Sequence, residues 1–160
     1  MGKYNTLVDI FHDAIATYPD NELFGTKKDG AWHWTTYLQF GKEVDRFRGG
    51  LASLGITRGD KVALISNNRV EWAVAAYACL GLGAAFVPMY EAQTPKDWEF
   101  IANDCEAKAI ICASDAITEK TKDLRKNLPS VKTIISFDPK TAVGDGVTTY
   151  KALIEAGETN

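Results

Sequence analysis

The sequence is poor in the residues that usually build metal centres and disulfide frameworks. It contains three cysteines and two histidines among 160 residues. Cys79, Cys105 and Cys112 lie inside apolar stretches without paired spacing, which is typical of small core residues in a reducing compartment. His12 and His33 have no second ligand at metal-binding spacing. We therefore expect neither a disulfide framework nor a metal site.

Long apolar runs and an excess of positive charge are also missing. No apolar run reaches the roughly 20 residues that a membrane-spanning helix needs. The first part of the chain is interrupted by Asp9, His12 and Asp13, unlike a secretory signal. The net charge of -3 argues against a nucleic-acid surface, which needs a basic stripe. These features predict a cytoplasmic protein with no transmembrane segment and no nucleic-acid partner.

What the sequence does contain is a continuous apolar centre in an ordinary globular composition of 46% hydrophobic and 24% charged residues. From residue 61 to 88 it predicts a strand, a helix and a second strand. The apolar residues of Val62–Ile65 are consecutive, which is typical of a strand covered on both faces in a parallel sheet. The helix is predicted over Val70–Leu82 and the second strand over Ala84–Val87, with Pro88 ending it. This unit predicts a buried core.

Helices and strands are predicted to alternate on both sides of this unit. Apolar runs that start at Val62, Ala85, Ala109 and Val131 are separated by helical patterns, which indicates consecutive βαβ crossovers. The other predicted elements are a helix capped by Thr6, a hairpin around Asp29–Gly30, a helix from Thr36 to Leu54, a helix capped by Thr94, a helix over Ser114–Leu128, a loop over 138–149 and a short helix from Tyr150.

The fold class is therefore predicted to be α/β, with a mostly parallel sheet, helices on both faces and a small N-terminal hairpin. We divide the chain into an N-terminal helix, hairpin and long helix (1–60), βαβ repeats of the sheet (61–137), and a loop with a short helix (138–160).

Candidate binding residues lie where the predicted strands end, because ligands of such sheets bind beyond the carboxyl ends of the strands. Asn67 and Asn68 follow the first strand, and Glu71 stands three residues after Asn68, as in a helix-capping box. The simplest interpretation is that the two asparagines cap the next helix; the alternative is that their amides face a ligand. Tyr90 either follows the end of a strand or forms the wall of a pocket. We take Asn67, Asn68 and Tyr90 as substrate-binding candidates.

Motifs for specific chemistry are not found. The segment 25–30 has two glycines, but Ala31 and Trp32 replace the Lys and Ser/Thr of a phosphate loop. No Gly-x-Ser-x-Gly motif frames a nucleophilic serine. The tryptophans are interpreted as core or interface anchors: Trp32, Trp34, Trp72 and Trp98. We therefore predict no catalytic residue in this sequence.

A family resemblance goes further than these patterns. The segments that carry it are Trp34–Tyr37 before a long helix, GDKVALI at 59–65 followed by SNNRVEW at 66–72, and LGLGAAFVP at 80–88. In this order and spacing they resemble the N-terminal region of the adenylate-forming, or AMP-binding, enzymes. Tyr90–Glu91 followed by WEFIANDCEAK at 98–108 is similar to the long-chain fatty acyl-CoA synthetases. The resemblance covers essentially the whole chain.

The resemblance implies the N-terminal part of the large domain of an ATP-dependent ligase. Such an enzyme joins a carboxylate to AMP and then transfers the acyl group to coenzyme A, with Mg²⁺ at the phosphates. The family's phosphate loop, ribose-binding segment, hinge and catalytic lysine have no counterpart here. We therefore expect an inactive fragment that binds no cofactor tightly, whose partner is the remainder of its own polypeptide.

Two further expectations follow from that fragment hypothesis. The isolated chain should expose apolar surface and self-associate, and the full-length enzyme should be cytoplasmic or peripheral to a membrane. The competing hypothesis is a stand-alone, non-enzymatic α/β module that binds a nucleotide or a partner. A ligand-induced rise in melting temperature without any downstream sequence would favour that module.

Overall fold

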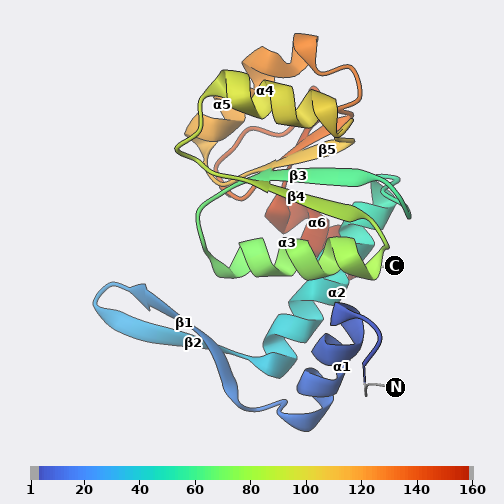
Figure 1. The fold of residues 1–160 in the computed structure, drawn as a ribbon. Coiled ribbons are helices and arrows are strands. Elements are labelled where there is room, and N and C mark those ends of the chain that lie inside the picture. The colour runs from blue at the N-terminus through green and yellow to red at the C-terminus, as the bar shows by residue number, and fades with distance from the viewer. Residues whose placement is uncertain (1–3, 159–160) are drawn as a thin grey trace.

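A five-stranded parallel sheet lies at the centre of the fold (Figure 1). The structure is a computed structural model, in which residues 4–158 are described. The strand order is β4-β3-β5-β6-β7. The strands are β3 (Lys61–Ile65), β4 (Ala85–Met89), β5 (Ala109–Cys112), β6 (Thr133–Ser136) and β7 (Val147–Thr149).

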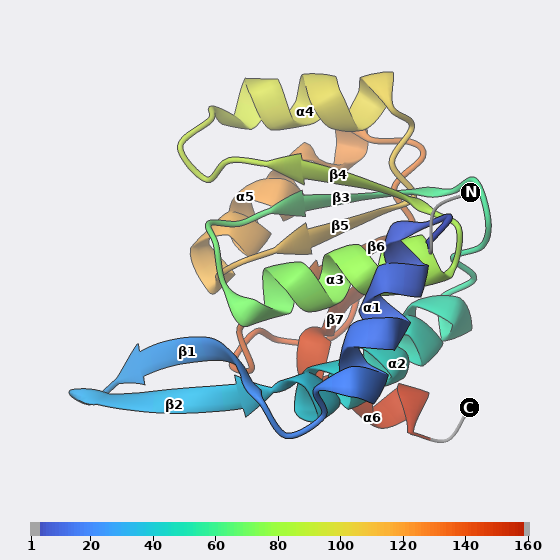
Figure 2. The same ribbon diagram turned by 60° about the horizontal axis from the view of Figure 1, so that its bottom comes forward.

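Helices cover both faces of this sheet, as predicted. Helices α4 (Pro95–Asp104) and α5 (Asp115–Leu124) lie on one face (Figure 1). The other face is covered by α3 (Val70–Gly81), α2 (Tyr37–Ser53) and α6 (Tyr150–Gly157), with α1 (Leu7–Thr17) outside α2 and α3 (Figure 2). None of the helices formed by residues 4–158 is long and apolar enough to cross a membrane.

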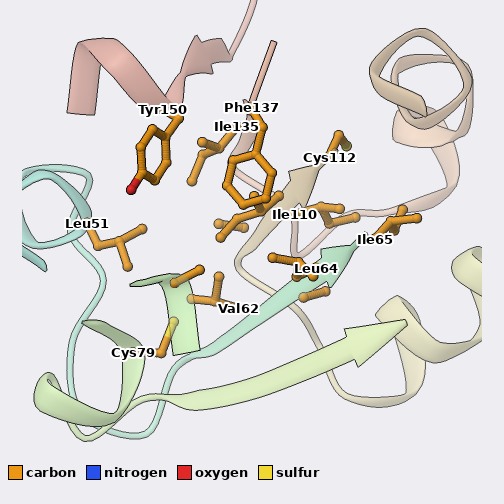
Figure 3. Packing of buried hydrophobic residues seen from close by; sticks show 14 of the residues in the cluster. Leu51, Val62, Leu64, Ile65, Cys79, Ile110, Cys112, Ile135, Phe137 and Tyr150 are labelled. Carbon is orange, nitrogen blue, oxygen red and sulfur yellow. The ribbon is translucent and has the colours of Figure 1, made fainter. Parts of the chain in front are cut away.

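The interior strand β3 is buried from Val62 to Ile65, which confirms the prediction from its continuous apolar run. It pairs with β4 on one side and β5 on the other, and Val62–Ile65 are each 0% exposed. Figure 3 shows Leu64 and Ile65 packed beside Ile110, with Tyr150 reaching the same core from α6. A strand paired on both edges and covered on both faces has no polar position, so alternation is absent from its sequence.

The sheet differs from the predicted one at both margins. Strand β4 continues through Pro88 to Met89, whereas the sequence predicted a buried strand that stops at Pro88. Because β4 is an edge strand, Pro88 can pair with Leu64 in the ladder without leaving a central hydrogen bond unmade. Strand β7 lies in a segment that the sequence predicted to be a loop. It could not be predicted, because three residues are too few to show the alternation of a strand.

Local capping decides where several helices begin. Thr6, Thr36 and Thr94 each form a capping box with the third helical residue, as their sequence spacing indicates. The helix predicted over Ser114–Leu128 begins as expected but ends earlier. Helix α5 stops at Leu124, and a 3₁₀ turn, η1 (Arg125–Asn127), follows it.

The predicted hairpin is formed by β1 (Glu22–Lys28) and β2 (Ala31–Thr36), and it projects from the body of the protein (Figure 1). Asp29 and Gly30 form its turn with φ values of 51° and 81°, the left-handed conformation that an Asp-Gly turn provides. Its base is attached by Phe24, whose ring centroid lies 5.1 Å from that of Phe40 in α2. The apolar side chains of α1 are only partly buried, since Phe11 is 7% exposed but Leu7 is 58% exposed.

Candidate functional site at the carboxyl ends of the strands

The sheet has a topological switch point between β3 and β5. The chain leaves β3 for β4 on one side and then crosses to β5 on the other side of β3. In open α/β sheets, ligands bind in the crevice that this reversal leaves beyond the carboxyl ends of the strands. The hairpin lies on the same side of the molecule as these strand ends (Figure 2).

The switch point is filled by the side chain of Arg69. Its guanidinium donates two hydrogen bonds of 2.7 Å to the carboxylate of Glu71 and one of 3.2 Å to the carbonyl oxygen of Ala113, directly after β5. The same group lies 5.0 Å from the ring centroid of Phe137, directly after β6. One side chain thus connects the segments that follow β3, β5 and β6.

The Arg69–Glu71 pair is held in its charged form. Burial opposes ionisation of Glu71, but the hydrogen bonds from Arg69, the helix N-terminal backbone and the charge of Arg69 outweigh it and hold the pKa of Glu71 below its usual value. The hydrogen bond to Glu71 in turn raises the pKa of Arg69. A bidentate arginine–carboxylate contact is directional, so the pair orients this loop as well as neutralising it.

Arg69 also corrects the prediction that Asn67 and Asn68 cap the next helix. The N-cap of α3 is Arg69 itself, and its side chain makes no capping hydrogen bond. Glu71 does not complete a capping box with Asn68, because its carboxylate is bound to Arg69. The side chains of Asn67 and Asn68 are thereby left at the surface of the loop.

The structure brings the three candidate residues together. Asn67, Asn68 and Tyr90 line one cavity of about 530 Å³ at the carboxyl ends of β3 and β4. The other residues that line it are Ser66, Trp72, Pro88 and Met89. Tyr90 is 74% exposed, so most of its ring faces solvent. Their proposed role in binding substrate stays a prediction.

Two residues that sequence reasoning missed hold this cavity in shape. Glu91 accepts a hydrogen bond of 2.8 Å from the backbone N–H of Asn67 and so joins the loops after β3 and β4. The indole Nε1 of Trp98 donates a 3.0 Å hydrogen bond to the carbonyl oxygen of Tyr90. A buried tryptophan needs a partner for its N–H, and that is the only signal that could have indicated the Trp98 contact.

A second, wider cavity of about 1040 Å³ separates the hairpin from the strand ends. Its wall includes Lys27 of β1, Glu43 of α2 and Glu71. The hydroxyl of Tyr150 donates a 2.7 Å hydrogen bond to Glu43, which joins α6 to α2 at this place. Burial, followed by the charge and hydrogen bond of Glu43, raises the pKa of Tyr150, so its hydroxyl stays protonated and acts as a donor.

The side chains that line the cavity at the ends of β3 and β4 could contact a ligand through the amides of Asn67 and Asn68 and the ring of Tyr90. The carboxylates nearest the switch point already accept hydrogen bonds, Glu71 from Arg69 and Glu91 from the Asn67 backbone. Within residues 4–158 no three or more His, Cys, Asp or Glu side chains form a group that could hold a metal ion.

The remaining residues singled out in the sequence separate into core and surface. Trp98 is 2% exposed and Trp72 is half-buried, as expected of core anchors, whereas Trp32 and Trp34 are 59% and 50% exposed. Trp32 and Trp34 are therefore not core residues, and the interface role that the sequence also allowed stays a prediction for them. Cys79 and Cys112 are buried free thiols, and burial raises the pKa of Cys79 to about 12, which suits an inert core residue.

Comparison with known proteins identifies the family. Residues 11–155 match the family described as "AMP-binding enzyme". The chain belongs to this family. Relatives include the long-chain-fatty-acid–CoA ligase FadD15 of Mycobacterium tuberculosis, which is 26% identical over 98% of this chain and 25% of its own length. The long chain acyl-CoA synthetase 5 of Arabidopsis thaliana is 30% identical over 81% of this chain and 20% of its length. The chain thus spans a quarter or less of these AMP-binding relatives.

Solved structures show the same fold. The anthranilate CoA ligase AuaEII, in complex with anthranoyl-AMP, has a TM-score of 0.81 at 22% identity over 97% of this chain and 28% of its own. The A-PCP didomain of a carboxylic acid reductase from Segniliparus rugosus, in complex with AMP, has a TM-score of 0.83 at 14% identity over 98% of this chain and 27% of its own. Residues 4–158 therefore have the α/β fold found in these two enzymes.

Proposed function

We propose that this chain is the N-terminal part of the large domain of an ATP-dependent ligase that acts on long-chain fatty acids. In this reaction a carboxylate oxygen attacks the α-phosphorus of ATP and pyrophosphate leaves. The thiol of coenzyme A then attacks the acyl carbon, and AMP leaves as the thioester forms. The substrates are ATP, a fatty acid and coenzyme A, with Mg²⁺ bound by parts of the enzyme outside this chain.

The observation that carries the proposal is the match to long-chain fatty acid ligases along nearly the whole chain. The relatives come from bacteria, animals and plants, and their names agree on the substrate class. The fold agrees with adenylate-forming ligases independently of sequence identity.

Within such an enzyme, the role of this chain is to provide a scaffold. The closed centre of the sheet and the Arg69–Glu71 pair hold the loops after β3, β4 and β5 in place. Asn67, Asn68 and Tyr90 line a cavity at these loops and are the substrate-binding candidates. The chain alone is then expected to carry out no ligation and to bind neither ATP nor coenzyme A tightly.

Pyrophosphate exchange tests this division of roles. The purified 160-residue chain is incubated with ATP, Mg²⁺, labelled pyrophosphate and palmitate, and the longer polypeptide encoded by the same reading frame is assayed beside it. We expect fatty-acid-dependent exchange from the longer polypeptide and only background from the short chain. Saturable exchange by the short chain, or none by the longer polypeptide, contradicts the proposal.

The stand-alone binding module predicts a different result. It requires that ATP or another nucleotide raise the melting temperature of the short chain in proportion to the logarithm of its concentration. Arg69 occupies the switch point where a doubly wound sheet binds its nucleotide. We therefore expect no such shift with ATP at millimolar concentration.

A further inference from the structure

The hairpin is mostly exposed although it carries large apolar side chains. Beyond its attachment through Phe24, it extends away from the helices (Figures 1 and 2). Trp32 is 59% exposed and Trp34 is 50% exposed, and both belong to β2. Two large rings left half in water on a projecting element indicate a surface made to be covered.

The two tryptophans form one preorganised face. Residues two apart in a strand point to the same side, and the ring centroids of Trp32 and Trp34 lie 5.9 Å apart in a stacked arrangement. Trp34 also lies across Gly25 of β1, where an added Cβ would come within 2.7 Å of the indole ring. This glycine lets the ring lie flat on the ribbon, so the aromatic face is held in place before any partner binds.

The edges of the hairpin indicate what kind of partner fits. In the part of the chain that the structure describes, β1 and β2 pair only with each other, which leaves one unpaired backbone edge on each strand. A two-stranded ribbon is only marginally stable by itself. Strand β1 ends in Lys27 and Lys28, and lysine protects an edge from pairing. Strand β2, AWHWTT, carries no Lys, Arg, Asp or Glu and is rich in residues that favour strands.

We propose that the free edge of β2 pairs with a β-strand from the part of the ligase polypeptide outside these 160 residues, with Trp32 and Trp34 packed against that part. The inference rests on the proposed function, because this chain spans a quarter or less of the ligases it resembles. A lipid surface could take up the indole rings, but it could not satisfy the unpaired backbone groups of the edge. A β-strand that pairs with this edge can satisfy the backbone groups, and the polypeptide that carries it can bury the indole rings.

Hydrogen exchange with mass spectrometry tests the pairing in two proteins, the 160-residue chain and the longer polypeptide of the same reading frame. We expect the β2 amides that face away from β1 to exchange about 100-fold or more slowly in the longer polypeptide, as expected when a ladder forms. Amides of the interior strand β3, which pairs on both edges, are the internal control and should be protected in both proteins.

A matched pair of substitutions shows whether the aromatic face carries the contact. Trp32→Glu removes an exposed ring and places a carboxylate opposite Lys27, its cross-strand neighbour, so the hairpin itself keeps a favourable pair. Phe100→Glu removes a ring that is 70% exposed on α4, on the other face of the sheet. In the longer polypeptide we expect Trp32→Glu to speed β2 exchange at least about tenfold and Phe100→Glu to leave it unchanged.

The possible outcomes separate this inference from the proposed activity. If β2 exchanges equally fast in both proteins while the longer polypeptide forms acyl-CoA, the pairing is wrong and the function stands. If β2 is protected but no acyl-adenylate forms, the activity is wrong and the pairing stands.

Protection of β2 in the short chain that rises with protein concentration would assign the edge to a second copy. Binding of the longer polypeptide to anionic vesicles that Trp32→Glu abolishes would assign the face to lipid. Either result overturns the pairing, as does a reading frame that ends at residue 160.

Discussion

Strand β3 of the parallel sheet and strand β2 of the hairpin both carry large apolar side chains, but in opposite surroundings. In β3, Val62–Ile65 are 0% exposed, because strands flank it on both edges and helices cover both faces. In β2, the two tryptophans are at least half exposed on a ribbon of two strands. The chain therefore covers the interior strand β3 completely but leaves its hairpin uncovered. An apolar strand in a sequence thus indicates that its side chains must be buried by packing against something. It does not indicate which segment packs against them.

The largest expected effect lies at the centre of the sheet. Leu64→Ala removes a fully buried side chain from β3 and leaves a cavity on one face of the sheet, beneath the helices that cover it. We expect a loss of about 3 kcal/mol in the free energy of unfolding, measured by urea denaturation. Val143→Ala, at a residue that is 66% exposed, should change it by less than about 0.5 kcal/mol. A loss below about 1 kcal/mol for Leu64→Ala would mean that the centre is loosely packed.

The contact between α2 and α6 should give the next largest effect. A Cβ on Gly50 would meet the carbonyl oxygen of Leu153 and lie 2.7 Å from its Cβ, so Gly50→Val forces the two helices apart. We expect a loss of about 2 kcal/mol in urea denaturation. At Gly81 an added Cβ would meet only the flexible side chain of Arg48 at 3.0 Å. Gly81→Ala should therefore stay within about 0.5 kcal/mol of the unmodified protein, and equal effects at both glycines would refute close packing of α6.

The Arg69–Glu71 pair, between the sheet and the hairpin, should have a smaller and pH-dependent effect. We expect Glu71→Gln to lower the unfolding free energy by about 1 kcal/mol at pH 7, since the pair is partly exposed to solvent. The pKa of Glu71 is lower in the folded than in the unfolded protein, where it is near 4.5, so its contribution is present above that pH. It is lost as the pH falls through the folded value.

Urea denaturation between pH 7 and pH 3 measures this dependence. The unfolding free energies of Glu71→Gln and of the unmodified protein should become equal near pH 3. Glu119→Gln is a matched control, because Glu119 forms an exposed pair with Lys122 on α5. It should change stability by less than about 0.5 kcal/mol. A difference between Glu71→Gln and the unmodified protein that persists undiminished at pH 3 would show that the charge of Glu71 is not the cause.

The smallest expected effect concerns the hairpin. Trp32→Ser in the 160-residue chain should lower the unfolding free energy by less than about 1 kcal/mol, because the ring is 59% exposed and contributes mainly its stacking on Trp34. Urea denaturation followed by circular dichroism measures the change. A loss above about 2 kcal/mol would show that the short chain already covers this ring, which would remove the contrast between hairpin and sheet.

Much of the fold could be predicted because its signals are local. The capping boxes at Thr6, Thr36 and Thr94 each join residues three apart. The Asp29–Gly30 turn requires a conformation that few other residue pairs adopt. In contrast, β7 could not be predicted from Val147–Thr149, because three residues become a strand only through pairing with β6.

The candidate site could be predicted only in outline. Asn67, Asn68 and Tyr90 lie at strand ends that a parallel sheet must bring to one side. The residues that shape the site include Arg69 and Glu91, which were missed because each also contacts a loop that is distant in sequence. Arg69 binds Ala113, and Glu91 binds the backbone of Asn67. No local pattern distinguishes such residues from ordinary surface charges.

The sequence by itself determined the α/β class, the alternation of strands and helices, and the family, because each depends on periodicity, capping or the order of short motifs. Only the tertiary structure decided that Arg69 and not Asn68 begins α3, that Pro88 stands in a strand, and that the hairpin tryptophans face water. The physical reason is that these outcomes depend on which neighbour each segment meets. Helix periodicity and capping are decided by residues a few positions apart. Which strand lies at an edge, which residues line a cavity and which side chains are buried are decided by contacts between distant segments.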